Sequence, residues 1–571
     1  MDVQQKLTRA FFITFTLLMA VGAHYFQHNQ GGSGLELAQN NVVWIFFSIL
    51  IGLGLWKITE QKKIIYSRFT IVFLIAVVLF FIPLFYPNNE LASQSYTRLL
   101  GLLAGFLFYV SLQQFQFNKA QLQRLLLLIV LAGFIQSCYS LMQDYLLTEG
   151  NIFGYAVSYG RPYGIFQQPN VLASFLVTTL VLSGYLLQQI SSRKLQFFLL
   201  LTAMINAWVI TITISRVGYL GALIAIALFT PWAWKQDKKK LLTFLLIVFI
   251  GIGIAALKPN FFDVKSGHVE NITQDNGRVI KYTNSLIMVK NKPLMGYGYG
   301  SFEKNYLIIQ AERVKNNEIP PAGEGILTHP HNDILYWAIE GGIVPILALL
   351  LLVVCFIHLL SNFKISKALL LSAFVLPISL HTQTEYPLYH SSLHWLVLLF
   401  LVFYVDSQTK KIKEANLQLT FALRIFALLI PLVTTIFMVT NLYAMYKITK
   451  FERSKQPDIN LLLDIVNPLV FEDKFTFHLN YFRLSMAIQR HKPEEIQAII
   501  NETEEIIEEK PRPYFYIILY IAYSNSGQKE QADTVLEYAR YLFPRDSQIA
   551  NINKQPTKST SPALETNIEK P

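Results

Sequence analysis

A short polar stretch, Thr328 to Asp333, lies directly before an apolar run that extends from Ile334 to Leu360. It contains His331, and an imidazole has a pKa close enough to neutrality to take a proton from a hydroxyl group at physiological pH. Pro330 suits the first turn of a helix, which would place His331 at a helix N-terminus where membrane meets water. We therefore expect His331 to be a general base. The alternative is a helix-terminal histidine that only binds backbone groups.

The residues beside His331 leave two simpler interpretations open. His329 lies two positions away, so the two imidazoles could bind a metal ion. This spacing, with no acidic cluster nearby, is poor for metal binding, and no metal is expected. Asn332 is a candidate for substrate binding, but both Asn332 and Asp333 are residue types that cap helices.

Three arginines stand out because ionisable side chains near a membrane are functional by default. Arg161, Arg216 and Arg278 are predicted to bind an anion, since a guanidinium grips phosphate oxygens in pairs and stays charged beside a membrane. Guanidinium groups near His331 would also disfavour its protonated form and keep it able to accept a proton. The alternative for each arginine is anchoring to lipid headgroups.

Amide and carboxylate side chains supply further candidates. Gln168 and Asn170 both donate and accept hydrogen bonds, which suits sugar hydroxyls, although Asn170 is also a common helix cap. His381 and Glu385 are four residues apart, so they share one face of a helix that Pro387 ends. They form either a structural pair or a group in which Glu385 orients a substrate or the base.

The composition indicates an integral membrane protein. Of the 571 residues, 53% are hydrophobic and only 15% are charged, and the mean hydropathy is +0.37. The net charge of +11 comes from short Lys and Arg clusters between apolar runs, which is typical of membrane orientation signals and not of a nucleic-acid groove. Cys138 and Cys355 each lie in an apolar run and predict neither a disulfide framework nor a zinc site.

Apolar segments near the ~20 residues that cross a bilayer predict about 13 transmembrane helices in an all-α polytopic fold. They centre on Phe11–Tyr25, Val42–Trp56, Phe69–Phe85, Leu99–Leu112, Leu125–Leu141, Val171–Leu187, Leu195–Ile214, Gly218–Trp234, Leu241–Leu257, Ile334–Leu360, Ala368–Leu380, Leu393–Val405 and Phe421–Tyr446. Basic residues cluster in every second loop, so the N-terminus is predicted to be cytoplasmic and the C-terminus to lie on the far side, the periplasm in a bacterium. All the polar candidates above then fall on that far face, which indicates one reaction centre.

Glu340 lies inside the tenth apolar run. We expect it to be an internal polar strut rather than a catalytic group. Gly341, Gly342 and Pro345 follow it closely and are expected to loosen this helix.

The chain divides by composition into five parts. Residues 1–150 are predicted to hold the N-terminal membrane helices, and residues 151–410 a catalytic membrane core with an ordered helical loop at 258–330. Residues 411–446 are the last span. Residues 447–550 are a soluble helical domain in which Tyr523, Gly527, Ala532, Ala539 and Pro544 match one tetratricopeptide-like helix pair. Residues 551–571 are predicted to be disordered.

Taken together, these motifs resemble the superfamily of bacterial O-antigen ligases and protein O-oligosaccharyltransferases, whose shared core is called the Wzy-C domain. The resemblance rests on the segment Arg161 to Asn170, Ser215-Arg216, Pro293 to Gly300 after Arg278, and His331-Asn332 with the glycines that follow. The segment His381 to Leu388, with Glu385-Tyr386-Pro387-Leu388, is similar to the protein O-oligosaccharyltransferase branch, as is a soluble region after the last span. One departure is Pro345, which stands where the ligase pattern would have its second glycine.

The resemblance implies a GT-C-like helical fold in the bacterial inner membrane with its active site in the periplasm. It implies transfer of a glycan from an undecaprenyl-pyrophosphate type carrier to Ser or Thr hydroxyls of a protein such as pilin, without metal or other cofactor. By position, His331 matches the family's essential histidine, Gln168 its amide, Tyr386 its tyrosine, and the arginines its pyrophosphate contacts. The alternatives are an O-antigen ligase acting on lipid A–core, an O-antigen polymerase, and a transporter of the lipid-linked sugar.

Overall fold

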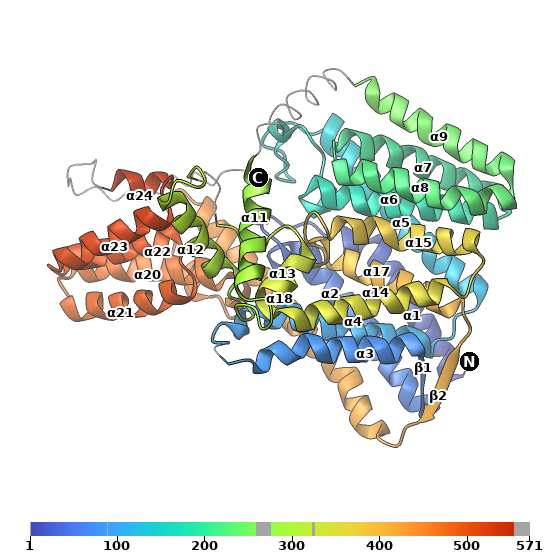
Figure 1. Ribbon diagram of the computed structural model, residues 1–571, viewed down its shortest axis with the longest axis horizontal. Helices are drawn as coiled ribbons and strands as arrows, with labels where there is room; N and C mark the ends of the chain where they lie inside the picture. Colours follow the sequence, from blue (N-terminus) through green and yellow to red (C-terminus); the bar gives the residue numbers. More distant parts are fainter. Residues whose placement is uncertain (1, 88, 259–275, 322–325, 553–571) are drawn as a thin grey trace.

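The computed structural model describes residues 2–87, 89–258, 276–321 and 326–552, and it is almost entirely helical (Figure 1). Within these residues, eleven helical segments are long and apolar enough to cross a membrane, judged by length and composition. The helices that carry these segments are α1 (Val3–Ala20), α2 (Ala38–Gln61), α3 (Arg68–Phe81), α4 (Tyr96–Gln114), α5 (Lys119–Tyr145), α6 (Pro169–Gln189), α7 (Arg193–Ile212), α8 (Arg216–Gln236), α9 (Lys238–Ala256), α14 (Ile343–Leu360) and α18 (Thr420–Arg453). The protein is therefore an all-α polytopic membrane protein.

Two of the expected spans are shorter apolar helices, α15 (Ile365–His381) and α17 (Ser392–Ser407). The count of about 13 spans therefore remains a prediction. A small antiparallel sheet was not expected: β1 (Lys63–Ser67) pairs with β2 (Ile412–Asn416), so that Lys63 faces Asn416. In Figure 1 this sheet lies at one end of the helix bundle, near the N-terminus.

Helix α6 is the centre of the bundle, because α5, α7, α8 and α15 all pack against it. Its buried residues occupy every side of the helix from Val171 to Leu187. A helix that is apolar all round is stable only inside such a bundle. Its N-terminus, at Pro169, therefore has a fixed place among its neighbours.

The apolar run 334–360 was expected to form one helix, and this prediction is wrong. The run forms α13 (Asp333–Gly341) and α14, separated at Gly342, which has φ +65° and ψ −146°. A Cβ atom at position 342 would lie 2.2 Å from the Leu294 carbonyl oxygen, so only glycine fits there. The placement of Pro330 in the first helical turn is also wrong, because α13 begins at Asp333 with Asn332 as its cap.

Two helices of the long loop are described, α11 (Asn276–Asn291) and α12 (Phe302–Lys315). Between them Gly296, Gly298 and Gly300 all have positive φ angles, which lets the chain turn tightly against α13. Tyr297 and Gly298 donate backbone hydrogen bonds to Ile339 and Glu340 of α13. Residues 259–275 and 322–325 of the predicted loop lie outside the described part of the chain.

After α18 the chain forms a further set of helices. They are α19 (Asn460–Leu463), α20 (Glu472–Gln489), α21 (Pro493–Glu509), α22 (Pro513–Asn525), α23 (Lys529–Leu542) and α24 (Ser547–Asn551). Gly527 makes the turn between α22 and α23 with φ +78°, and Ala532 and Ala539 are buried, but the tetratricopeptide-like repeat remains a prediction. Residues 553–571 of the predicted tail lie outside the described residues.

Candidate active site

A cavity of about 190 Å³ is lined by residues of the loops that precede α6 and α13 and of the loop that follows α15. Four of the residues predicted from the sequence line it: His331, Gln168, Glu385 and Tyr386. The other lining residues are Gly31, Gly32, Gln167, Val171 and His390. Gln168 and Glu385 are 217 residues apart in the chain. Their side chains meet at this site through a hydrogen bond.

The loop before α6 is held by two glutamines of α5. Gln143 accepts hydrogen bonds from the backbone N–H groups of Tyr163 and Gly164 and donates to the Gly164 carbonyl. Gln136 accepts from the Ile165 N–H group at 3.0 Å. These bonds fix the loop that carries Gln168 into the cavity.

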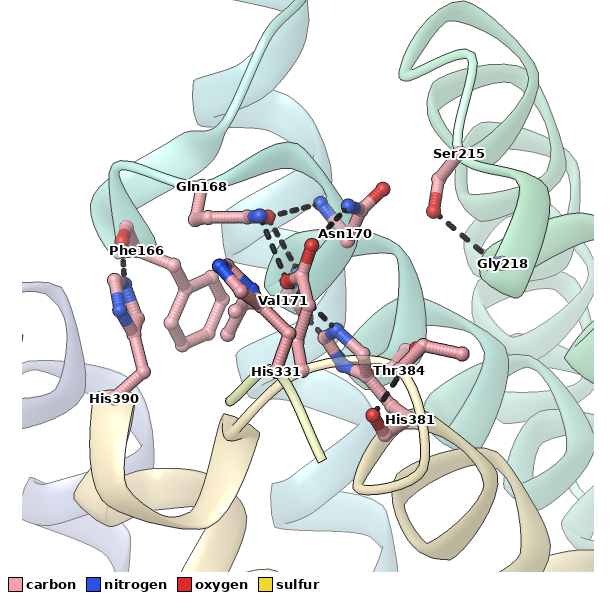
Figure 2. Close-up of polar contacts among 12 residues, drawn as sticks. Phe166, Gln168, Asn170, Val171, Ser215, Gly218, His331, His381, Thr384 and His390 are labelled. Atoms are coloured by element: carbon pink, nitrogen blue, oxygen red, sulfur yellow. Dashed lines mark hydrogen bonds and ion pairs between the residues drawn. The ribbon is translucent and has the colours of Figure 1, made fainter. Parts of the chain in front are cut away.

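Figure 2 shows Gln168, Asn170, His331 and His381 gathered at this site. The Glu385 carboxylate is the hub of the polar contacts there. It accepts hydrogen bonds from Gln168 Nε2 at 2.8 Å, from Asn170 Nδ2 at 2.7 Å and from His381 Nε2 at 3.1 Å. Gln168 also caps α6, because its side-chain oxygen accepts from the backbone N–H groups of Asn170 and Val171. The predicted pairing of His381 with Glu385 is therefore present.

Glu385 is charged at neutral pH. Burial opposes ionisation, but the hydrogen bond and charge of His381, the hydrogen bond from Asn170 and the charge of His331 together lower the pKa of Glu385 to about 2. Only 8% of the residue is exposed. The cavity wall therefore carries a fixed negative charge beside His331.

His331 has an uncommon backbone conformation, which among the non-glycine lining residues it shares with Gln167. Its φ angle is +56°, in the left-handed region, which costs a non-glycine residue about 1–2 kcal/mol. Its N–H group donates to His329 Nδ1 at 2.9 Å, and its carbonyl accepts from the Tyr282 hydroxyl at 3.3 Å. Both backbone polar groups of His331 therefore have a partner. The residue also lines the cavity.

The His331 imidazole is neutral at physiological pH. Burial, the charge of Lys281 and, more weakly, the charge of Arg278 lower the pKa of His331 to about 4, against the opposing charge of Glu385. The sequence predicted that guanidinium groups would keep this residue neutral, whereas burial and the Lys281 ammonium contribute more than the Arg278 guanidinium. A neutral imidazole has a lone pair available to accept a proton.

Tyr386 stands beside His331, with ring centroids 6.0 Å apart. Burial and then the charge of Glu385 raise the pKa of Tyr386 to about 12, so its hydroxyl keeps its proton and can donate. It directly precedes the short helix α16 (Pro387–His390), whose first residue is Pro387. Tyr386 therefore adds a hydrogen-bond donor to the cavity wall.

None of the three arginines lines the cavity. Arg161 is buried and its Nε donates to the Thr213 carbonyl at 2.6 Å. Arg216, the first residue of α8, and Arg278, on α11, are exposed. Their predicted role as an anion clamp remains a prediction.

Asn332 has a structural place. Its side-chain oxygen caps α13 by accepting from Leu335 N–H at 3.0 Å, and its amide donates to the Gln383 carbonyl at 2.9 Å. It joins the histidine segment to the loop that carries Glu385. Like Asn170 and His381, it supports the cavity from behind rather than lining it.

Several residues at the site were not singled out from the sequence. Gly31 and Gly32 form the cavity rim, and the run Gly31-Gly32-Ser33-Gly34 was a signal that could have revealed this loop. His390 lines the cavity and shares a 2.8 Å hydrogen bond with the Phe166 carbonyl. No third ligand accompanies His329 and His331, since the described residues contain no metal-binding cluster of His, Cys, Asp or Glu.

Glu340 is fully buried, as its interpretation as a polar strut requires. It forms an ion pair with Arg98, and it accepts a hydrogen bond from the Phe302 N–H group. The Arg98 guanidinium also lies 4.1 Å from the ring centroids of Tyr336 and Trp337. This pair connects α4, α12 and α13.

Three family models match successive parts of the chain. Residues 162–187 match a protein glycosylation ligase model, and residues 197–350 match an O-antigen ligase model. Residues 369–557 match the C-terminal part of a virulence factor membrane-bound polymerase model. Each segment that contributes a predicted site residue to the cavity falls within one of these matches.

Two curated relatives come from Acinetobacter baylyi. A general O-oligosaccharyltransferase is 23% identical over 414 residues, which cover 69% of this chain and 68% of the relative. A ComP-specific O-oligosaccharyltransferase is 27% identical over 268 residues, which cover 46% of this chain and 47% of the relative. The similarity therefore extends to about two thirds of one relative and about half of the other.

Proposed function

The matches support an O-oligosaccharyltransferase of the Wzy-C superfamily, and from this premise we propose that the protein transfers an oligosaccharide from a polyprenyl-pyrophosphate carrier to Ser or Thr hydroxyls of a protein. The enzyme works in the bacterial inner membrane, with the cavity open to the periplasm. An acceptor such as pilin would approach from that side. The observation that carries this proposal is a neutral imidazole, His331, in a cavity that also holds the charged Glu385 carboxylate.

The reaction follows from these two groups. The His331 lone pair accepts the proton of the acceptor hydroxyl as its oxygen attacks the anomeric carbon. The carbon–oxygen bond to the pyrophosphate breaks, and the bonding electrons leave with the carrier. A single displacement of this kind inverts the configuration at that carbon. The Glu385 charge stabilises the imidazolium that forms on His331.

The pyrophosphate leaving group activates the lipid-linked donor. A pyrophosphate develops negative charge as it departs, and positive groups aimed at it lower the barrier. Arg161, Arg216 and Arg278 supply that charge in this proposal. The exposure of Arg216 and Arg278 leaves them accessible to a lipid-linked substrate that arrives along the membrane surface.

A second candidate function uses the same cavity with a lipid acceptor. The matches to O-antigen ligase and membrane-bound polymerase models favour it. In that case the acceptor hydroxyl belongs to lipid A–core or to another glycan chain. A transporter is disfavoured, because transporter sites lie near the bilayer midplane whereas this cavity lies at the loop end of the bundle.

Co-expression of the protein with a lipid-linked glycan and candidate acceptor proteins tests the proposal. Intact-protein mass should show a gain of one glycan on the acceptor, and His331→Ala should lose it by a factor of about 10²–10⁴. Lipopolysaccharide banding in a deletion strain provides the comparison. Loss of banding with unchanged protein mass would assign the lipid acceptor instead.

A further inference from the structure

His331 must be held in its left-handed conformation by its surroundings. A residue with a side chain rarely adopts a φ of +56°, and such a conformation persists only where neighbouring contacts impose it. The His331 N–H group has one hydrogen-bond acceptor, His329 Nδ1, at 2.9 Å. This bond spans two residues, the same span as in an Asx turn, where a side-chain oxygen accepts from the N–H group two positions later.

His329 is itself rigidly placed. Only 4% of the residue is exposed, and its ring lies between Tyr336 and Tyr386, with centroid distances of 4.6 and 4.3 Å. Its Nε2 atom is 3.3 Å from the Asp333 carboxylate. Because Nδ1 accepts from a backbone N–H group, the neutral ring carries its proton on Nε2 and donates it to Asp333.

We propose that His329 is a positioning residue, whose Nδ1 atom holds the His331 backbone left-handed so that the His331 imidazole faces the cavity. This inference rests on the proposed role of His331 as the base. If φ at position 331 returned to its usual negative range, the Cα–Cβ bond would point in a different direction. The alternative is that His329 only fills the space between two tyrosines.

Three substitutions separate these roles. His329→Asn keeps an oxygen that can accept from the N–H group two residues later. His329→Leu keeps much of the volume, and His329→Phe keeps a ring between Tyr336 and Tyr386, but neither has an acceptor. Each variant is purified in detergent, and kcat and KM for the lipid-linked donor are measured.

The expected result is a loss of kcat for Leu and Phe with little change in KM. Misplacing a catalytic group by about 1 Å costs about 100-fold, so both variants should lose kcat on that scale, while Asn stays within about fivefold of the wild type. A filler role predicts the opposite order, with Phe closest to the wild type. Equal activity of the Asn and Leu variants overturns the proposal.

A second measurement does not depend on the reaction. With His329 present, His331→Gly should have a higher thermal midpoint than His331→Ala, because glycine adopts a positive φ without steric cost. In a His329→Leu background the backbone at 331 can relax, so the difference between Gly and Ala should disappear. An unchanged difference overturns the proposal.

The kinetic and the thermal measurements together also separate this inference from the proposed function. If His331→Ala retains full transfer activity, the proposed base is wrong, yet the thermal comparison still shows whether His329 holds the backbone. If the wild type modifies a lipid instead of a protein, kcat of the His329 variants is compared with that lipid as the acceptor, and the same order of activities is expected.

Discussion

The two oxygens of Glu385 are both occupied, one by Asn170 and the other by Gln168 and His381. With a pKa of about 2, this carboxylate is too weak a base to take a proton from a hydroxyl group. In the proposed reaction its contribution is its charge, which acts on the nearby His331. The two residues differ because their environments differ: Glu385 is held as an anion, and His331 is kept neutral.

Glu385→Gln should lower kcat by about 10²-fold, because it removes the charge that stabilises the protonated form of His331. The donor KM should change much less. Measured transfer rates at saturating donor check this expectation. The matched variant Glu385→Asp keeps the charge and should recover part of the loss; an Asp variant no better than Gln would contradict a role for the charge.

The pH dependence of the rate should lack the usual histidine inflection. Because burial and Lys281 lower the pKa of His331 to about 4, the base is unprotonated at all higher pH values, and kcat/KM should stay level between about pH 5.5 and 8. An ordinary histidine would instead give a rise near pH 6.5. A pH profile of kcat/KM for the wild type makes this comparison.

Removing the nearest lysine charge provides the control for this pH profile. Lys281→Met should move the rise in rate toward neutral pH, because the charge that disfavours the imidazolium is lost. Lys290→Met removes a charge from an exposed position at the far end of the same helix and should leave the profile unchanged. Equal shifts in both variants would contradict the assignment.

At the scale of residues, the sequence was informative where a residue type is chemically unusual for its place. His331, Gln168, Glu385 and Tyr386 were expected near one another, and they line one cavity. Gly31 and Gly32 were not expected to line the cavity, because a glycine has no side chain whose chemistry would indicate a role. The role of His329 in binding the His331 N–H group depends on a φ angle, and no residue pattern indicates that angle.

At the scale of elements, α13 is anchored by a charge pair inside a largely apolar setting. Arg98 comes from α4 and Glu340 from the end of α13, and the Glu340 side chain is completely buried. A buried pair contributes little net stability, but loss of one partner leaves an uncompensated charge. The pair therefore fixes where α13, and the histidine segment before it, can lie.

Arg98→Met should destabilise the protein by about 3–5 kcal/mol, since Glu340 is left buried without its partner. The double variant Arg98→Met with Glu340→Gln removes both charges and keeps an acceptor for the Phe302 N–H group, so it should recover most of that loss. Thermal unfolding in detergent compares the variants. A double variant less stable than Arg98→Met alone would contradict this account.

The limits of sequence-based prediction at this scale are visible in the run 334–360. Hydropathy marks the run as one apolar segment, and the glycines indicated a weak point, but not a complete break. The break depends on the Leu294 carbonyl, which approaches Gly342 from a distant part of the chain. Contacts of this kind are set by tertiary packing, which periodicity does not report.

At the scale of the whole molecule, the helices after α18 pack on α12 of the long loop. Leu307 and Ala311 of α12 join one apolar cluster with Leu536 and Ala539 of α23. Arg512 adds an ion pair to Glu303 of α12 at 2.9 Å. The C-terminal helices and α12 thus pack together, and Figure 1 shows α12 beside α22 and α23.

Arg512→Ala should loosen this contact, because Arg512 also pairs with Asp473 of α20 at 3.2 Å. The expected loss is about 2 kcal/mol, the scale of a hydrogen bond to a charged group. Limited proteolysis after α18 should become faster. Arg490→Ala removes an equally charged but exposed side chain and should leave the cleavage rate unchanged; equal acceleration in both variants would contradict the contact's importance.

Much of this large-scale arrangement could be predicted, because apolar length and basic clusters are averaged over many residues. The positive-inside pattern placed the polar candidates on one side, and the structure brings four of them to one cavity. The packing of α12 on the C-terminal helices could not be predicted. It depends on complementary surfaces that are more than 200 residues apart in the chain.

The pairing of α2 with α18 has a consequence for biosynthesis. Asn441 donates a hydrogen bond to Asn41 at 2.8 Å, and both side chains are completely buried between these helices. The Asn41 amide nitrogen donates to the nearby carbonyls of Leu35 and Leu37, but its oxygen has this donor only after α18 leaves the ribosome, long after α2 enters the bilayer. A nascent chain arrested before residue 420 should therefore lack this contact between α2 and α18, even with His331, the proposed base, already made.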